Sequence, residues 1–130
     1  ICSTGTSRNP TPEGEFTLPD TARKEWRLFK TYNTYVRYAV HIKGNYFFHS
    51  LLYRKPDIKT LSRPSLRKLG SPASHGCIRM TVADCKWIYD HCPSGTVVTV
   101  GDNLPAPFDR PETEKIPEGQ DWDPTDPEIG

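Results

Sequence analysis

The sequence predicts a mainly β domain with one substantial helix and an irregular acidic tail. Apolar residues alternate over positions 35–42, as in a half-buried strand, and an apolar stripe at helical spacing runs over positions 81–92. The 130 residues have a formal net charge of +1, yet residues 1–100 sum to +8 and residues 101–130 to −7. We therefore expect a body of about a hundred residues, enough for one hydrophobic core, followed by an extension of different composition.

The first half of the chain favours short strands. ICSTGT at the N-terminus is typical of a strand end, and a Gly/Pro-rich loop leads to a new strand at Phe16. We expect further strands before residue 1, because a domain seldom begins so abruptly. Over 35–42 the alternation predicts one strand with Arg37 and His41 opposite its apolar face. Gly44-Asn45 then turns the chain into a second strand over 46–52, which predicts a hairpin.

The second half predicts two helices and a last strand. Pro64 to Leu69 favours a short helix within a polar, basic segment. The longer helix should run from Thr81 to Cys92, with the Thr81 side chain as its N-cap and Asp84 three residues on. Its apolar stripe consists of Val82, Cys85, Ile88 or Tyr89, and Cys92. Pro93-Ser94-Gly95 ends this helix, and positions 96–100 then predict a buried strand.

Composition separates a domain over 1–104 from an acidic, Pro-rich tail over 105–130. Six of the 13 prolines lie between Pro105 and Pro127, and aliphatic residues are few. Such a composition is typical of extended or irregular segments. Trp122 is the exception, because a solvated linker does not need a large apolar side chain. We expect Trp122, and with it Ile116, to dock on the domain.

Several function classes are disfavoured by the sequence. There is no apolar run of about 18 residues, no nucleotide-binding loop and no Lys/Arg block, so neither a membrane nor a nucleic acid is an expected partner. A zinc site from His75, Cys77, Cys85 and Cys92 fails on ligand spacing, and we expect no metal or cofactor. Cys85 and Cys92 would lie about 10 Å apart on one helix, too far for a disulfide. Cys2 could pair with either of them.

The segment SHGCIRM, residues 74–80, combines a thiol with groups that can activate it. Cys77 is a nucleophile only as a thiolate, so it needs a base. His75 is near in sequence but should point away at i−2, which makes His49 at the end of a strand the better candidate. Gly76 lets a carbonyl approach the backbone, where the amides of Gly76 and Cys77 could hold an oxyanion. Arg79 could bind a carboxylate with its two-pronged donor geometry.

These residues resemble the signature of the L,D-transpeptidases, the YkuD-type catalytic domain of bacterial cell-wall enzymes. In that signature an upstream histidine precedes a Ser/Thr-His-Gly-Cys core. The resemblance extends to CSTG at 2–5 with TPEGEF at 11–16, to Phe48-His49-Ser50 and to the helix after the cysteine, and so spans roughly residues 2–100. It implies a β-sandwich-like fold.

The resemblance also implies a cysteine acyltransferase. Cys77 would attack the L-centre carbonyl of diaminopimelate, or its equivalent, in a peptidoglycan tetrapeptide stem and expel D-alanine. The thioester would then pass to the amine of a neighbouring stem, forming a 3→3 cross-link. His49 would be the base with Ser50 beside it, and His75 and Ser74 would shape the site. The oxyanion hole would consist of amides near Gly76 and Cys77, and Arg79 takes a position where some members carry Asn and others Arg.

Alternatives and departures from the family pattern remain open in the sequence. Water in place of the amine would make the protein an L,D-carboxypeptidase, and a non-catalytic cell-wall binding module is the alternative of another class. Positions 50–73 separate His49 from Ser74 by more than the family's usual spacing. This basic insertion is either a lid that recognises carboxylates or a solvated loop. The substrate implies a location outside the cytoplasmic membrane, in the cell envelope or secreted. We expect a monomer, and we expect carbapenem-type β-lactams to acylate Cys77 because they mimic the acyl donor.

Overall fold

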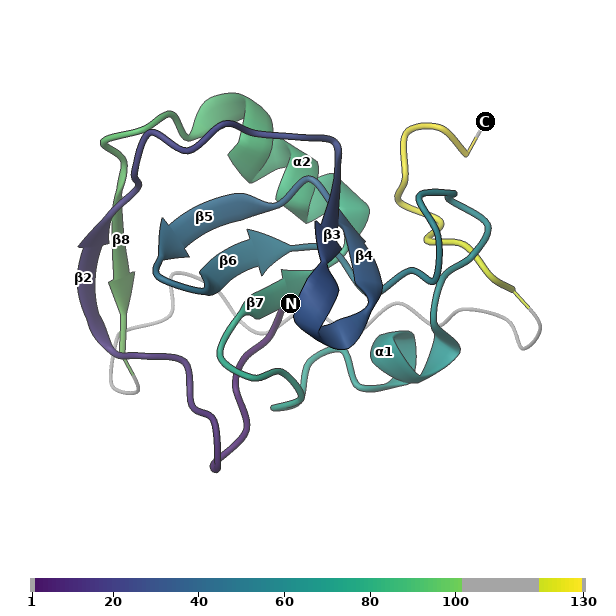
Figure 1. Cartoon of the computed structure of the whole chain (residues 1–130), viewed down its shortest axis with the longest axis horizontal. Coiled ribbons are helices and arrows are strands. Elements are labelled where there is room, and N and C mark those ends of the chain that lie inside the picture. The colour runs from purple at the N-terminus through teal and green to yellow at the C-terminus, as the bar shows by residue number, and fades with distance from the viewer. Residues whose placement is uncertain (1, 102–119, 130) are drawn as a thin grey trace.

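The computed structural model describes residues 2–101 and 120–129 (Figure 1). Short strands dominate, which confirms the predicted mainly β class. The elements in chain order are β1 (Cys2–Ser3), β2 (Gly14–Thr17), β3 (Trp26–Phe29), the 3-10 helix η1 (Lys30–Tyr32), β4 (Thr34–Arg37), β5 (Val40–Lys43), β6 (Tyr46–His49), α1 (Arg63–Arg67), β7 (Ile78–Met80), α2 (Val82–His91) and β8 (Val97–Val100).

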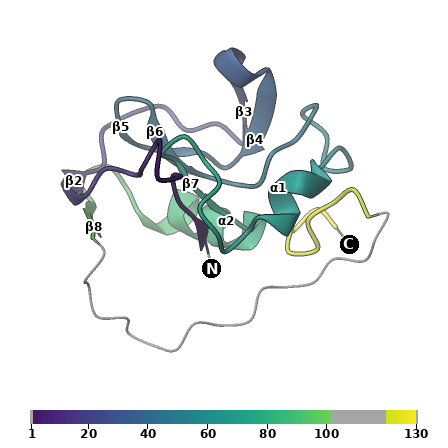
Figure 2. The same ribbon diagram turned by 90° about the horizontal axis from the view of Figure 1, so that it is seen from below.

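The strands form one four-stranded sheet and two small ribbons. The sheet has the order β1-β7-β6-β5, in which β6 and β7 run parallel and the other neighbours antiparallel. The pairs β2–β8 and β3–β4 make the ribbons. Helix α2 lies on one side of the sheet, and the β3–β4 hairpin projects on the other (Figure 2). The parallel β6–β7 pair requires a long crossover, which positions 50–77 supply.

A hydrophobic core joins the sheet, α2 and the crossover. The stripe predicted for α2 is confirmed, because Val82 and Cys85 are buried while Ile88, Tyr89 and Cys92 pack against the core. The insertion at 50–73 is not merely a solvated loop. It contributes four buried apolar side chains to this core, namely Leu51, Tyr53, Leu61 and Leu69. Burial of that kind stabilises a fold by about 1.5–3 kcal/mol per side chain.

The single strand predicted over 35–42 is wrong. The chain bends at Tyr38, whose φ is +50°, so that β4 pairs with β3 while β5 joins the main sheet. The bend changes which side chains face inward. Arg37, predicted opposite the apolar face, is fully buried. The hairpin predicted at Gly44-Asn45 is confirmed between β5 and β6.

The N-terminus of α2 is capped by other residues than the sequence predicted. Thr81 occupies the N-cap position, but its side chain makes no capping hydrogen bond. Instead Asp123 Oδ2 accepts the Val82 N–H at 2.9 Å, and Thr125 Oγ1 accepts the Ala83 N–H at 3.1 Å. The C-terminal segment therefore satisfies the first amides of α2, as an N-cap side chain otherwise would.

Two further predictions changed at β8 and α1. The last strand is not buried, since Val97 on β8 is 56% exposed and the strand alternates between exposed and half-buried residues. Helix α1 forms where a short helix was predicted, but it begins at Arg63 and ends at Arg67.

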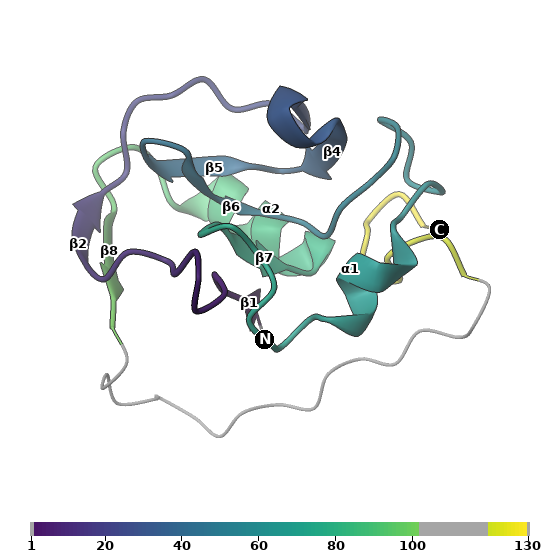
Figure 3. The same cartoon turned by 60° about the horizontal axis from the view of Figure 1, so that its bottom comes forward.

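The segment 120–129 lies against the domain beside α1 and one end of α2 (Figure 3). The Leu61 N–H donates to the Asp121 carbonyl at 3.0 Å, and Arg63 pairs with the Asp121 carboxylate at 2.9 Å. Trp122 is half-buried, consistent with docking, and Ile116 lies outside the described residues. The end of the acidic tail is thus part of the folded body.

Three absences hold for the part of the chain that the structure describes. No helix there is long and apolar enough to cross a membrane. No three His, Cys, Asp or Glu side chains gather as metal ligands would. No disulfide joins Cys2 to Cys85 or Cys92 within residues 2–101, a pairing that the sequence left open.

Candidate active site

Two parallel strands bring the chemically active side chains together. In the β6–β7 register Phe48 lies opposite Ile78 and His49 lies opposite Arg79. Cys77 immediately precedes β7 and is half-buried, with its thiol donating to the Asn45 carbonyl at 3.4 Å. The parallel pairing therefore brings residues of two segments, 28 positions apart, onto adjacent strands in the middle of the sheet.

The turn before Cys77 is held by its own serine and requires a glycine. Ser74 Oγ accepts the Gly76 N–H at 3.1 Å and donates to the Cys77 carbonyl at 2.5 Å. Gly76 has a φ of +124°, and a Cβ there would lie 2.2 Å from Cε1 of Tyr46. Both the backbone conformation and the neighbouring ring exclude a side chain at this position.

The N-terminal CSTG and TPEG segments form hydrogen bonds to the backbone of this turn and of the residues just before it. The Thr4 carbonyl accepts the N–H groups of Ala73 at 2.9 Å and Ser74 at 3.1 Å. Thr11 Oγ1 accepts the Gly5 N–H at 2.9 Å and donates to the Gly76 carbonyl at 2.7 Å. Segments more than 60 residues away in sequence thus set the conformation around Cys77.

His49 is buried and held in one tautomer. It is 3% exposed, and its Nδ1 lies 2.6 Å from the Ser50 carbonyl oxygen. Because a carbonyl only accepts, Nδ1 carries the proton and Nε2 is left with a lone pair. The Phe29 ring meets the imidazole edge-on at 5.3 Å. Burial lowers the pKa of His49 to about 4, so the imidazole is neutral at pH 7.

The positive charge of Arg79 acts on both His49 and Cys77 and lowers the pKa of each, against the effect of burial in the case of Cys77. Burial raises the pKa of Cys77, while the Phe47 backbone N–H and the charge of Arg79 oppose that rise. Burial lowers the pKa of Arg79, whose guanidinium nevertheless remains charged. The Nε of Arg79 is buried without a hydrogen-bond partner among the described residues. A buried cationic donor in that state is suited to an anionic ligand.

Two cavities meet at Cys77. The smaller, of about 150 Å³, is lined by Cys77, His49, Arg79, Ser74, His75, Leu52, Phe29, Tyr32 and Thr34. The larger, of about 650 Å³, continues past Cys77 along η1 and the β5–β6 turn. His75 is exposed and stacks on Tyr32 at 4.9 Å, and both rings line both cavities. The thiol is therefore accessible from two sides.

The structure brings together five of the predicted site residues and separates others. Cys77, His49, His75, Ser74 and Arg79 share the smaller cavity. Ser50 is fully buried behind His49. The Gly76 N–H donates to Ser74 Oγ in this structure, and its predicted role as an oxyanion donor stays a prediction.

The other candidate histidines and the basic insertion lie elsewhere. His41 bonds Thr21 at 2.8 Å and the Gly44 carbonyl at 2.6 Å, and His91 stacks on Trp87. None of the basic side chains described in 50–73 lines either cavity at Cys77. Arg54 and Arg63 instead border a separate hollow with Asp121, so these two side chains do not line the cavities at Cys77, while Leu52 of the same segment does.

A family model describing the L,D-transpeptidase catalytic domain, YkuD, matches residues 1–100. The chain belongs to the YkuD family. YciB of Bacillus subtilis (strain 168), whose name assigns it to the L,D-transpeptidases, is 38% identical to this YkuD chain over 97 residues. The aligned region is 73% of the chain and 48% of YciB, so the chain spans about half the length of that relative.

Solved L,D-transpeptidases share the fold of this YkuD domain. One from Mycobacterium tuberculosis H37Rv superposes with a TM-score of 0.60 at 27% identity, covering 78% of the chain and 42% of that protein. L,D-transpeptidase 3 from Mycobacterium tuberculosis, solved with a faropenem-derived adduct, gives a TM-score of 0.58 at 26% identity, covering 78% of the chain and 43% of that protein.

Aromatic residues of the β3–β4 hairpin are the part of the YkuD site that sequence reasoning missed. Phe29 and Tyr32 line both cavities, although they precede Cys77 by more than 40 residues. Tyr32 is 55% exposed at the hairpin tip. The one local signal was a large aromatic residue in a polar turn, KTYN, which a solvated loop does not require.

Proposed function

We propose that this YkuD domain is a peptidoglycan L,D-transpeptidase with Cys77 as its nucleophile. The thiol attacks the L-centre carbonyl of a tetrapeptide donor stem, D-alanine leaves, and the acyl group passes to an acceptor amine to form a 3→3 cross-link. One observation carries the proposal. A half-buried thiol, a neutral buried imidazole and a half-buried arginine, whose Nε has no hydrogen-bond partner among the described residues, line the same cavity of about 150 Å³.

Proton transfer in the first half-reaction runs between Cys77 and His49. The pKa of the thiol is raised and that of the imidazole is lowered, so both groups are neutral before substrate binds. His49 Nε2 takes the thiol proton as Sγ forms its bond to the carbonyl carbon. Collapse of the tetrahedral intermediate breaks the C–N bond, and the imidazolium returns the proton to the departing D-alanine amine.

The second half-reaction uses the same groups in reverse. The acceptor amine attacks the thioester carbonyl and gives a proton to His49, the C–S bond breaks, and Cys77 recovers its proton. We assign the oxyanion contact to the Cys77 amide, since the Gly76 amide is occupied by Ser74. Arg79 would bind the carboxylate of the stem, and His75 with Tyr32 would form the wall between donor and acceptor.

Two cavities that share one thiol suit a reaction with two peptide substrates. The smaller cavity holds Arg79 and His49, which favours the carboxylate-bearing donor there. The larger cavity reaches Cys77 from the other side and has room for an acceptor chain. We infer on the same grounds that carbapenem-type β-lactams acylate Cys77, because they present a strained carbonyl and a carboxylate; a relative at 26% identity carries a faropenem-derived adduct.

The proposed substrate also sets the compartment. Mature peptidoglycan lies outside the cytoplasmic membrane, so we propose an extracytoplasmic location, in the cell envelope or secreted, with the domain acting as a monomer. Periplasmic or cell-wall fractionation of the tagged chain tests the location, and sedimentation equilibrium tests the oligomeric state.

Incubation with a disaccharide-tetrapeptide, followed by mass spectrometry, tests the reaction. We expect a 3→3 linked dimer with release of D-alanine, and no product from Cys77→Ala. Tripeptide without dimer would assign the chain as an L,D-carboxypeptidase instead. Binding to peptidoglycan without turnover by the folded wild type would assign a non-catalytic module.

A further inference from the structure

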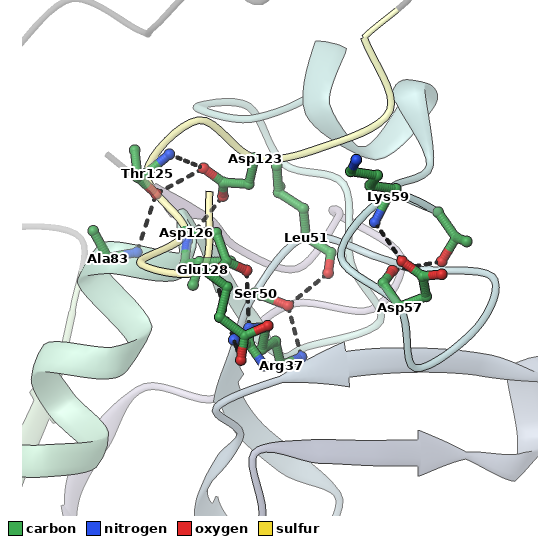
Figure 4. A network of polar contacts seen from close by, with 12 residues as sticks. Arg37, Ser50, Leu51, Asp57, Lys59, Ala83, Asp123, Thr125, Asp126 and Glu128 are labelled. Carbon is green, nitrogen blue, oxygen red and sulfur yellow. Dashed lines mark hydrogen bonds and ion pairs between the residues drawn. The ribbon is translucent and has the colours of Figure 1, made fainter. Parts of the chain in front are cut away.

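We propose that Asp126, in the C-terminal segment 120–129, is a positioning residue for His49 that acts through Arg37 and Ser50. The segment lies outside residues 1–100, which match the family. The proposal rests on the proposed function, in which His49 is the base. Figure 4 shows the buried contacts around Arg37 and Ser50 that carry it.

The first link is a buried ion pair. Arg37 Nε lies 2.9 Å from Asp126 Oδ2, and a guanidinium Nη donates to Asp126 Oδ1 at 3.3 Å. Both side chains are fully buried, while Glu128, which also pairs with Arg37 at 2.9 Å, is half exposed. Asp126 is therefore the acid that compensates Arg37 inside the protein.

Aromatic rings complete the enclosure of Arg37. Its guanidinium carbon lies 5.0 Å from the Trp26 ring centroid and 4.7 Å from that of Tyr38. Such an enclosure allows the guanidinium little movement while Asp126 is charged. Removal of one partner from a buried pair leaves an uncompensated charge, which must then move toward water or rearrange its surroundings.

The second link joins Arg37 to Ser50 through the backbone. The Arg37 N–H donates to Ser50 Oγ at 2.8 Å, and the Ser50 N–H donates back to the Arg37 carbonyl at 3.2 Å. Ser50 Oγ in turn donates to the Leu51 carbonyl at 2.7 Å. Two reciprocal hydrogen bonds thus fix the peptide unit of Ser50 relative to the end of β4.

The third link reaches the imidazole. The Ser50 carbonyl accepts the His49 Nδ1–H at 2.6 Å, which sets both the tautomer and the ring orientation. Every side chain along this path, Asp126, Arg37, Ser50 and His49, is at most 3% exposed. A shift of Ser50 would therefore rotate Nε2 of His49 relative to Cys77 rather than be absorbed by solvent.

A matched control lies in the same segment. Asp123 is buried to 1% exposure, close to the 2% of Asp126, but its carboxylate serves α2 and Thr125. Asp126→Asn and Asp123→Asn each remove one buried negative charge from the C-terminal segment 120–129. They differ in whether the lost contact leads to His49.

The test is a double-mutant cycle on the rate at which a carbapenem acylates the chain, measured at a temperature where circular dichroism shows each variant folded. We expect Asp126→Asn to slow acylation by about 10- to 100-fold, as a misplaced catalytic group does. In a His49→Gln background the same substitution should have no further effect. Asp123→Asn should acylate at the wild-type rate.

Two results would overturn the proposal while leaving the proposed function intact. One is a wild-type acylation rate for folded Asp126→Asn. The other is an equal loss in the wild-type and His49→Gln backgrounds, which would show that Asp126 acts by another route. If Asp126→Asn does not fold, Ser50→Ala removes one of the two reciprocal hydrogen bonds between Arg37 and Ser50 without leaving a buried charge, and a smaller loss with the same non-additivity is expected. A wild-type rate for His49→Gln would instead overturn the proposed function, and this proposal with it.

Discussion

His49 and Arg79 lie opposite each other across the parallel strands β6 and β7. The positive charge of Arg79 lowers the pKa of His49 and also lowers that of Cys77. Burial is the main reason that the imidazole stays unprotonated, and the charge of Arg79 adds to that effect; the same charge opposes the burial that raises the pKa of Cys77. A neutral base beside a cation is a physical arrangement suited to general-base activation of a thiol.

Replacing Arg79 tests this electrostatic role. With Arg79→Gln the positive charge near Sγ is lost, so the pKa of Cys77 should rise further above its usual range. Alkylation of Cys77 by iodoacetamide, followed over pH by mass spectrometry, should then have its midpoint at higher pH than in the wild type. Lys24→Gln, an exposed charge change away from the cavities, is the control. An unchanged midpoint would count against the role of Arg79.

Gly76 should tolerate no side chain. Gly76→Ala places the new methyl group against the Tyr46 ring, and it forces a residue with a side chain to adopt a positive φ. We expect a loss of about 1–3 kcal/mol of stability. Acylation should fall about tenfold or more because the turn holding Cys77 shifts.

Gly95→Ala separates the steric effect from backbone strain. Gly95 has a φ of +92° but open space around it, and it lies after α2, away from the site. This variant should lose stability yet keep the wild-type acylation rate. A wild-type acylation rate for Gly76→Ala as well as for Gly95→Ala would show that the conformation of the Gly76 turn is not needed for acylation.

His49 makes the fold sensitive to acid. Its pKa is about 4 in the folded chain and about 6.5 when unfolded, so the unfolded state binds more protons between those pH values. Stability should therefore fall as pH drops from 6.5 to 4, by about 3 kcal/mol from this residue. Urea unfolding of His49→Gln should lack that component. The same pH slope in both proteins would mean that His49 is not buried in its neutral form.

Thr11 should matter although it lies far from Cys77 in sequence. Its hydroxyl links the Gly5 N–H to the Gly76 carbonyl, and Thr11→Val leaves both groups unpaired. We expect a loss of about 1–3 kcal/mol in stability, measured by thermal unfolding, with slower acylation. Thr17→Val, at an exposed position of β2, serves as the control. A loss no greater than that of the control would remove Thr11 from the support of the turn.

Local signals explain what could be predicted. The Gly44-Asn45 turn and the apolar stripe of α2 each depend on residues within a few positions of one another, and both were confirmed. The grouping of Cys77 with His49 came from the need for a base other than His75 and from the resemblance, because the parallel pairing of β6 with β7 leaves no local signal. The family resemblance itself was confirmed over residues 1–100.

Long-range contacts explain what could not be predicted. Tyr38 interrupts the alternation at 35–42 because it adopts a positive φ that tertiary packing maintains, and no turn residue marks the place. Arg37 looks like a surface residue until Asp126, 89 positions later, compensates its charge. The Thr81 cap gave way to Asp123 for the same reason, since a distant carboxylate occupies the helix terminus.

Acylation at a single thiol is the most direct test of the account. After incubation with a carbapenem, the intact mass should rise by one adduct per chain, and peptide mapping should place that adduct on Cys77. Cys77→Ala should gain no mass, and His49→Gln should react at least ~100-fold more slowly, as expected for loss of a general base. An unmodified wild-type chain that is folded, or an adduct that persists in Cys77→Ala, would contradict the assignment of Cys77 as the nucleophile.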